Sequence, residues 1–165
     1  MNKLCNELES FVNCALNNEY EAAYFYEGLV IHFKRLGLHG FARFFSKQVE
    51  EERRHIHYLT EYLLNTRDFC PSLLTVVAPP VFPSSTVGCF KAALNKEIAI
   101  TSSIKELINK AVFYGDDHLD YFLRSFFLNE QYKSIAELNS HIQILSNLEC
   151  SFINIWLYDK DLKFE

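Results

Sequence analysis

The chain has 165 residues, of which 49% are hydrophobic and 15% aromatic, and its formal net charge at pH 7 is −5. This length and composition indicate one globular domain, residues 1–165, with a substantial core, and they exclude a disordered chain. The acidic balance, without any block of Lys and Arg, disfavours binding to nucleic acid or to an anionic membrane surface.

Targeting and membrane segments are not expected. Residues 1–7 lack the long apolar core of a signal peptide, and no stretch approaches the ~20 consecutive apolar residues of a membrane span. The five cysteines are scattered and form no CxxC pair, which favours a reducing intracellular compartment and disfavours thiol catalysis or a zinc–cysteine site. We therefore expect a cytoplasmic protein.

Residues 3–36 form the first predicted helix. Apolar and aromatic residues recur on one face at spacings of three and four, and Glu19 is the one polar residue on that face. Gly37 and Gly40 bracket a short turn, which predicts a second helix antiparallel to the first.

The second predicted helix, 41–65, contains neither proline nor glycine, and its inward face carries Gln48, Glu52 and His55 among apolar residues. Glu52 and His55 are three residues apart, so they project from the same face about one turn apart. A carboxylate in a bundle core costs several kcal/mol unless it is paired or bound to a cation.

Residues 66–86 lack helical periodicity and contain Pro71, Pro79, Pro80 and Pro83. An extended chain of this length reaches over ~60 Å, whereas a helix of about 25 residues is only ~38 Å long. The segment therefore predicts a single long crossover that runs the length of a helical bundle.

Two more long helices and a short one follow. The third, 87–113, carries Glu97 on its apolar face, and the fourth, 117–145, carries Gln131. The last segment, 150–162, is too apolar for a free tail, and we expect a short fifth helix packed against a partner or the end of the bundle. The predicted fold class is all-α, a four-helix bundle.

Five polar residues of the four inward faces lie at one height. Each is fourteen to nineteen residues from the turn of its own hairpin, or roughly 21–29 Å at ~1.5 Å per residue. Three carboxylates in one dry layer repel each other, so one or two cations satisfy them better. Carboxylates plus one imidazole suit iron, manganese or zinc, and a bridging carboxylate suits two metals ~3.5–4 Å apart. The converging residues are Glu19, Glu52, His55, Glu97 and Gln131.

At these residues the sequence resembles the non-haem ferritins, over nearly its whole length. The resemblance is to a bacterial-type ferritin with a ferroxidase centre like that of the H-chain. It implies a ferritin-like bundle with one long crossover between helices two and three and a short fifth helix. The matching segments are 18–20 with Tyr26, 51–55, 96–97, 116–119, 128–131, 137–138 with His141, and 157–162.

The resemblance implies a role for each residue of the layer. Glu19, Glu52 and His55 would bind a first iron, and Glu52 would bridge to a second. Glu97 would bind the second iron, with the amide of Gln131 beside it.

Further residues take their roles from the same resemblance. Tyr26 would hydrogen-bond a ligand and can donate an electron, while Glu51 and Glu130 would face the path of iron into or out of the centre. Lys133 stands where many di-iron proteins have the histidine of a second ExxH, so the second metal depends on Gln131. Met1 is the only methionine, so haem held between paired methionines is not expected.

The implied reaction is oxidation of Fe(II) by dioxygen or peroxide, with two Fe per subunit. Fe(III) would then be stored as a mineral inside a homo-oligomeric cage of twenty-four subunits. One alternative is a di-metal peroxidase of the rubrerythrin type without iron storage, although the chain lacks a paired-cysteine rubredoxin module. A cage subunit that does not oxidise iron would lack the layer acids, which this chain keeps. A DNA-protecting mini-ferritin would carry a basic arm, which this chain lacks.

Overall fold

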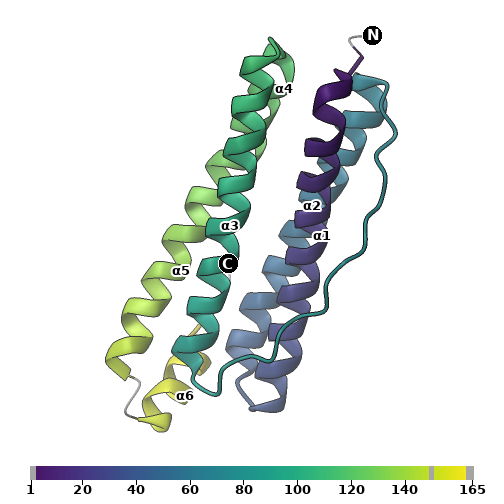
Figure 1. Cartoon of the computed structure of the whole chain (residues 1–165). Helices are drawn as coiled ribbons and strands as arrows, with labels where there is room; N and C mark the ends of the chain where they lie inside the picture. The colour runs from purple at the N-terminus through teal and green to yellow at the C-terminus, as the bar shows by residue number, and fades with distance from the viewer. Residues whose placement is uncertain (1–2, 149–150, 163–165) are drawn as a thin grey trace.

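The computed structural model describes residues 3–148 and 151–162, and every regular element among them is helical. Four long helices form a bundle, and a short helix lies at one end of it (Figure 1). The predicted all-α four-helix bundle with a long crossover and a short fifth helix is therefore confirmed. The elements are α1 (Asn6–Arg35), α2 (His39–Arg67), α3 (Thr86–Phe113), α4 (Asp117–Leu123), the π-helical segment η1 (Arg124–Leu128), α5 (Asn129–Leu148) and α6 (Phe152–Asp161).

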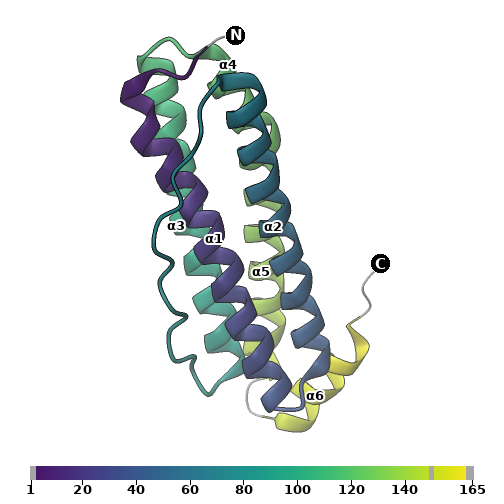
Figure 2. The ribbon, with the colours of Figure 1, turned by 90° about the vertical axis from the view of Figure 1, so that its right-hand side faces the viewer.

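The crossover runs the full length of the bundle, as its length and prolines predict (Figures 1 and 2). Asp68 ends α2 in the left-handed conformation, with φ at 48°. Farther along, the crossover lies tightly against α1, because a Cβ on Gly28 would come within 2.9 Å of both Pro79 and Phe82. Ser85 then begins α3 by accepting a hydrogen bond from the backbone of Gly88.

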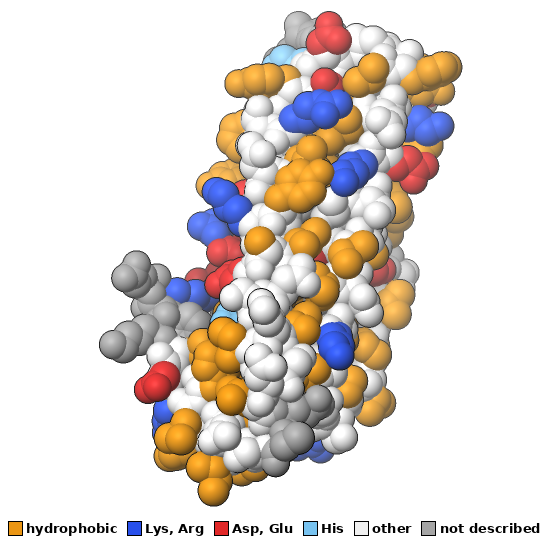
Figure 3. Space-filling view, turned by 90° about the vertical axis from the view of Figure 1, so that its left-hand side faces the viewer, with side chains coloured by type: hydrophobic (Ala, Val, Ile, Leu, Met, Phe, Trp, Pro, Cys, Tyr) orange, Lys and Arg blue, Asp and Glu red, His pale blue; other side chains and the backbone are white. Residues whose placement is uncertain are grey.

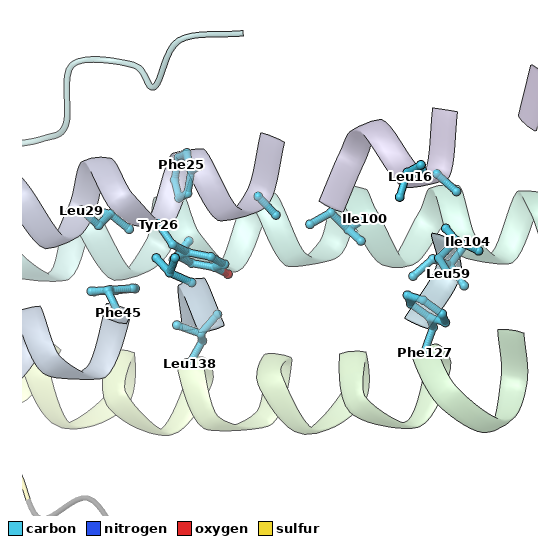
Figure 4. Close-up of a cluster of buried hydrophobic side chains, with 14 of the residues drawn as sticks. Leu16, Phe25, Tyr26, Leu29, Phe45, Leu59, Ile100, Ile104, Phe127 and Leu138 are labelled. Carbon is cyan, nitrogen blue, oxygen red and sulfur yellow. The ribbon is translucent and has the colours of Figure 1, made fainter. Parts of the chain in front are cut away.

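The core is one cluster of buried apolar side chains, and the part of it drawn in Figure 4 forms two groups along the bundle axis. In both groups, side chains from all four long helices meet, and each is less than 10% exposed. On every helix the predicted polar position falls between the two groups in sequence, so the polar layer lies at the waist of the bundle. One group includes Leu16, Leu59, Ile104 and Phe127, and the other includes Tyr26, Leu29, Phe45 and Leu138, with Phe90 of α3 against the Phe45 ring.

The fourth long helix consists of α4, η1 and α5 in succession. It departs from the prediction of one continuous α-helix over 117–145. It extends to Leu148 and contains the π-helical segment η1. Its buried residues Leu119, Leu123, Phe127 and Gln131 are spaced by four, whereas an α-helix turns once in 3.6 residues. The wider π turn accommodates one extra residue and keeps all four side chains on the inner face.

Helix α6 packs across the end of the bundle, beside the turn between α1 and α2 (Figure 2). Its Asp159 is 1% exposed and accepts a hydrogen bond of 2.7 Å from the backbone N–H of Phe41. Leu38, which precedes α2, offers no side-chain cap, so Asp159 satisfies one of the free N–H groups at the start of that helix. The predicted position 150 lies outside the described residues.

The surface is mixed in character. On the face shown in Figure 3, Lys and Arg side chains are dispersed among apolar and acidic ones. No helix in the described part of the chain is long and apolar enough to cross a membrane.

Candidate metal centre

Glu19 on α1 and Glu52 and His55 on α2 meet at the waist of the bundle. Their exposed fractions are 1%, 2% and 5%. Nδ1 of His55 lies 3.2 Å from Oε2 of Glu19 and 3.0 Å from Oε2 of Glu52. One potential ligand atom from each residue lies within 4.8 Å of the others. Two helices thus present two carboxylates and one imidazole nitrogen to the same point.

Glu97 on α3 adds a third acid to the layer and is 0% exposed. Its Oε1 accepts a hydrogen bond from the hydroxyl of Tyr26, a residue that is also 0% exposed. Its Oε2 is buried and has no hydrogen-bond partner among the described residues. A buried carboxylate oxygen without a donor is costly, and a cation would satisfy it.

Gln131, 1% exposed, completes the layer from α5. Its Oε1 accepts a hydrogen bond of 3.0 Å from the hydroxyl of Thr101, which directs the amide within the core. The sequence reasoning missed Thr101, because a threonine among apolar residues gives no distinct signal. The available signal was its spacing, since Thr101 lies four residues after Glu97 and therefore on the same face of α3.

The two accessory acids differ in their placement. Glu130 reaches the centre, because its Oε2 lies 2.7 Å from Nε2 of His55. Glu51 is half-buried and forms an ion pair of 3.5 Å with Arg54, and it makes no hydrogen bond to the layer among the described residues.

Burial and mutual repulsion disfavour charge on the acids of the layer. Burial, followed by the charge of Glu52, raises the pKa of Glu97 to about 7. Burial and the neighbouring Glu19 raise the pKa of Glu52, against the opposing hydrogen bond from His55. Burial, and then the charges of Glu97 and Glu52, raise the pKa of Tyr26 well above its usual value, so its hydroxyl stays a donor.

His55 is the positive counterpart of these acids. Burial alone would lower its pKa, but the hydrogen bonds and charges of Glu19 and Glu52 outweigh burial and raise the pKa to about 11. In the metal-free protein one imidazolium therefore partly compensates the acids. A divalent cation at the same point would replace the proton on Nδ1 and interact with the carboxylates directly.

The sequence profile of the ferritin-like domain family matches residues 10–148, most of the chain. The chain belongs to the ferritin family. A bacterial non-heme ferritin from Staphylococcus epidermidis is 30% identical to this ferritin over 159 residues, which cover 96% of this chain and 95% of the relative. Ferritin-2 of Vigna unguiculata, a chloroplastic protein, is 32% identical over 170 residues. That match covers 99% of this ferritin but 67% of the chloroplastic protein.

Solved structures agree on the fold. An open pore ferritin from the hyperthermophilic archaeon Archaeoglobus fulgidus matches this ferritin with a TM-score of 0.93. The match covers 98% of both chains at 23% sequence identity. The bundle, the crossover and the short terminal helix of this ferritin are thus arranged as in that protein.

Proposed function

We propose that this ferritin is a ferroxidase and iron-storage subunit that oxidises Fe(II) to Fe(III) at the waist of the bundle. The observation that carries the proposal is the buried cluster of Glu19, Glu52 and His55, beside a buried oxygen of Glu97 without a donor. Carboxylates and one imidazole are suitable ligands for iron, and two nearby sites suit a two-electron reaction.

Each residue has a defined task in this proposal. Glu19, Glu52 and Nδ1 of His55 bind the first Fe(II), and Glu52 also bridges to the second. Glu97 binds the second Fe(II), and the Gln131 amide lies beside that site. The supporting geometry is the separation of 4.8 Å or less among the ligand atoms of the first three residues.

The remaining proposed parts concern electrons and transport. Two Fe(II) ions each lose one electron. With two protons from water, the two electrons reduce dioxygen to hydrogen peroxide, or hydrogen peroxide to two water molecules. Tyr26, hydrogen-bonded to Glu97, orients that ligand and can donate an electron to the oxidant in place of one from iron. Glu51 and Glu130 face the path by which iron enters or leaves the centre. Fe(III) then collects as a mineral in a cytoplasmic cage of twenty-four copies of this chain.

Anaerobic titration with Fe(II), followed by mixing with dioxygen, tests the proposal. The wild type is expected to bind two Fe(II) per chain and to oxidise them rapidly. Glu52→Gln and His55→Ala are expected to lose most of the first binding step and to slow oxidation at least about 100-fold, because each removes a ligand. Glu106→Gln, an exposed acid on α3, is the charge-matched control.

Diffraction from crystals soaked with Fe(II) under anaerobic conditions gives the ligand set directly. Oxidation that proceeds equally fast in the wild type, Glu52→Gln and His55→Ala would show that the buried layer is not the catalyst. Iron bound elsewhere on the chain would contradict the assignment of ligands.

A further inference from the structure

The two ring nitrogens of His55 face different carboxylates. Nδ1 lies toward Glu19 and Glu52, inside the layer, at 3.2 and 3.0 Å. Nε2 points out of the layer, to Oε2 of Glu130 at 2.7 Å. The imidazole is 6% exposed, whereas the side chain of Glu130 is 52% exposed, so the contact joins the buried centre to the surface of α5.

An imidazole can bind a cation through the lone pair of only one nitrogen, and the other nitrogen then carries the proton. The hydrogen bond made by the second nitrogen decides which tautomer is present and fixes the orientation of the ring. A carboxylate is a strong acceptor for such an N–H group. The contact between Glu130 and Nε2 therefore favours the tautomer with the proton on Nε2, which leaves the lone pair on Nδ1.

We propose that Glu130 is a positioning residue, which holds the proton of His55 on Nε2 and directs the Nδ1 lone pair at the cation shared with Glu19 and Glu52. This inference rests on the proposed ferroxidase function. It gives Glu130 a task beyond the iron path that the family resemblance implies for it. Its partner on that path, Glu51, contacts Arg54 at 3.5 Å instead of the imidazole.

The backbone of the fourth helix supports this assignment. Glu130 and Gln131 follow directly after the π-helical segment η1, which ends at Leu128. Consecutive residues on a helix point about 100° apart, so one reaches the rim of the layer and the other its interior. Glu130 accordingly contacts His55, while Gln131 contacts Thr101.

Equilibrium binding of Co(II), under anaerobic conditions and without iron, tests the proposal, because equilibrium affinity does not depend on the route of entry. Glu130→Ala is expected to weaken the first Co(II) by about 10- to 100-fold and to alter the ligand-field absorption of the bound ion. Glu130→Gln keeps an amide oxygen that accepts from Nε2–H, and it is expected to recover most of the affinity and the wild-type spectrum.

Three variants complete the comparison. Glu106→Gln serves as the charge-matched control, His55→Ala shows the effect of losing the imidazole, and Glu51→Gln removes the neighbouring acid. If Glu51→Gln weakens Co(II) binding as much as Glu130→Ala does, the loss of affinity comes from removing a nearby negative charge. That result would overturn the inference.

Two further results would overturn it while leaving the proposed centre intact. One is unchanged Co(II) affinity and spectrum in Glu130→Ala, when His55→Ala loses the site. The other is Glu130→Gln weakening binding as much as Glu130→Ala. Failure of the wild type to bind Co(II) at all, or binding unaffected by His55→Ala, would instead overturn the proposed centre, and this inference with it.

Discussion

Glu97 shows how a single buried carboxylate links stability to pH. Its pKa in the folded protein is about 7, against an ordinary value of 4.5. Between these values the folded chain binds more protons than the unfolded chain, so rising pH lowers the free energy of unfolding. Glu97→Gln removes this cost, and it is expected to stabilise the metal-free protein by on the order of 2 kcal/mol more at pH 8 than at pH 5.5.

Thermal midpoints measured with a chelator present, at both pH values, check this expectation. Glu106→Gln, an exposed acid on the same helix, is expected to change the midpoint equally at the two pH values. The same stabilisation of Glu97→Gln at pH 5.5 and pH 8 would contradict the raised pKa.

Cation binding should show the opposite dependence on pH. Protons on Glu97, Glu52 and Nδ1 of His55 must leave before these atoms bind a cation, and all three groups have raised pKa values in the metal-free protein. We therefore expect the affinity for Zn(II), a redox-inert probe, to be at least about ten-fold greater at pH 8 than at pH 6. Calorimetry in two buffers of different protonation enthalpy measures both the affinity and the protons released. Affinity independent of pH, or binding without proton release, would contradict it.

In the fourth long helix, the π-helical segment η1 keeps buried residues that are spaced by four on one face. Leu119, Leu123, Phe127 and Gln131 are all buried at intervals of four. Removing one residue from η1 would make the intervals four, three and four, which an uninterrupted α-helix accommodates. Deletion of Ser125, within η1, is therefore expected to preserve helical content and to lower the thermal midpoint by only a few degrees.

Deletion of Ser134 is the matched comparison, because it lies in regular α-helix beyond the π turn. It would rotate the following residues by about 100° and turn Leu138 and Leu145 out of the core. Loss of each buried leucine costs about 2–5 kcal/mol, so this deletion is expected to be far more destabilising. Circular dichroism during thermal unfolding separates the two variants. Equal midpoints would mean that η1 does not absorb the extra residue.

Helix α6 depends on the absence of a side chain at Gly40. A Cβ there would overlap the backbone oxygen of Asp159, so α6 or the start of α2 would have to move. Gly40→Ala is therefore expected to displace α6 and to break the hydrogen bond from the Phe41 N–H to Asp159. Hydrogen exchange over 152–161 is expected to accelerate, while His39→Ala, an exposed neighbour, leaves it unchanged. Unaltered exchange in Gly40→Ala would contradict the close packing.

Much of this architecture follows from apolar spacing. The four inward faces and the polar residues on them, such as Glu19 and Glu97, are apparent because a helix places every third or fourth residue on one side. The length and prolines of 66–86 likewise predict the crossover. The turn at Gly37 follows from its glycine, which adopts a φ of 73°.

Other features do not follow from spacing. The π turn arises because packing of the whole fourth helix outweighs the local preference for α geometry, and no single residue in 124–128 signals it. The contact between Glu130 and His55 depends on that turn and on side-chain rotamers. The bond from Phe41 to Asp159 joins residues 118 positions apart, so only the assembled fold brings them together.

The isolated chain leaves apolar surface uncovered. Helix α6 exposes Phe152, Ile153, Trp156 and Leu157, with exposed fractions of 65%, 68%, 41% and 49%. Contiguous exposed apolar side chains of this size usually mark a contact with another chain. Because α6 lies at the end of the bundle, this surface is available for contact with another copy of the chain in the proposed cage. Twenty-four chains of 19.3 kDa would form a particle of about 463 kDa.

Ile153→Asp is expected to shift the particle to smaller species, because it places a charge in the apolar surface of α6, where desolvation on assembly is costly. Asn154→Asp adds the same charge one residue away on the same helix, at an exposed polar position, and is expected to leave assembly intact. Size-exclusion chromatography with light scattering measures the mass of each. The helical content of both variants should match the wild type, since Ile153 is outside the core. A particle unchanged by Ile153→Asp would exclude α6 from the contact.

The mass of the wild type also tests the alternative function. A wild-type dimer that consumes peroxide without retaining iron would favour the rubrerythrin-type alternative.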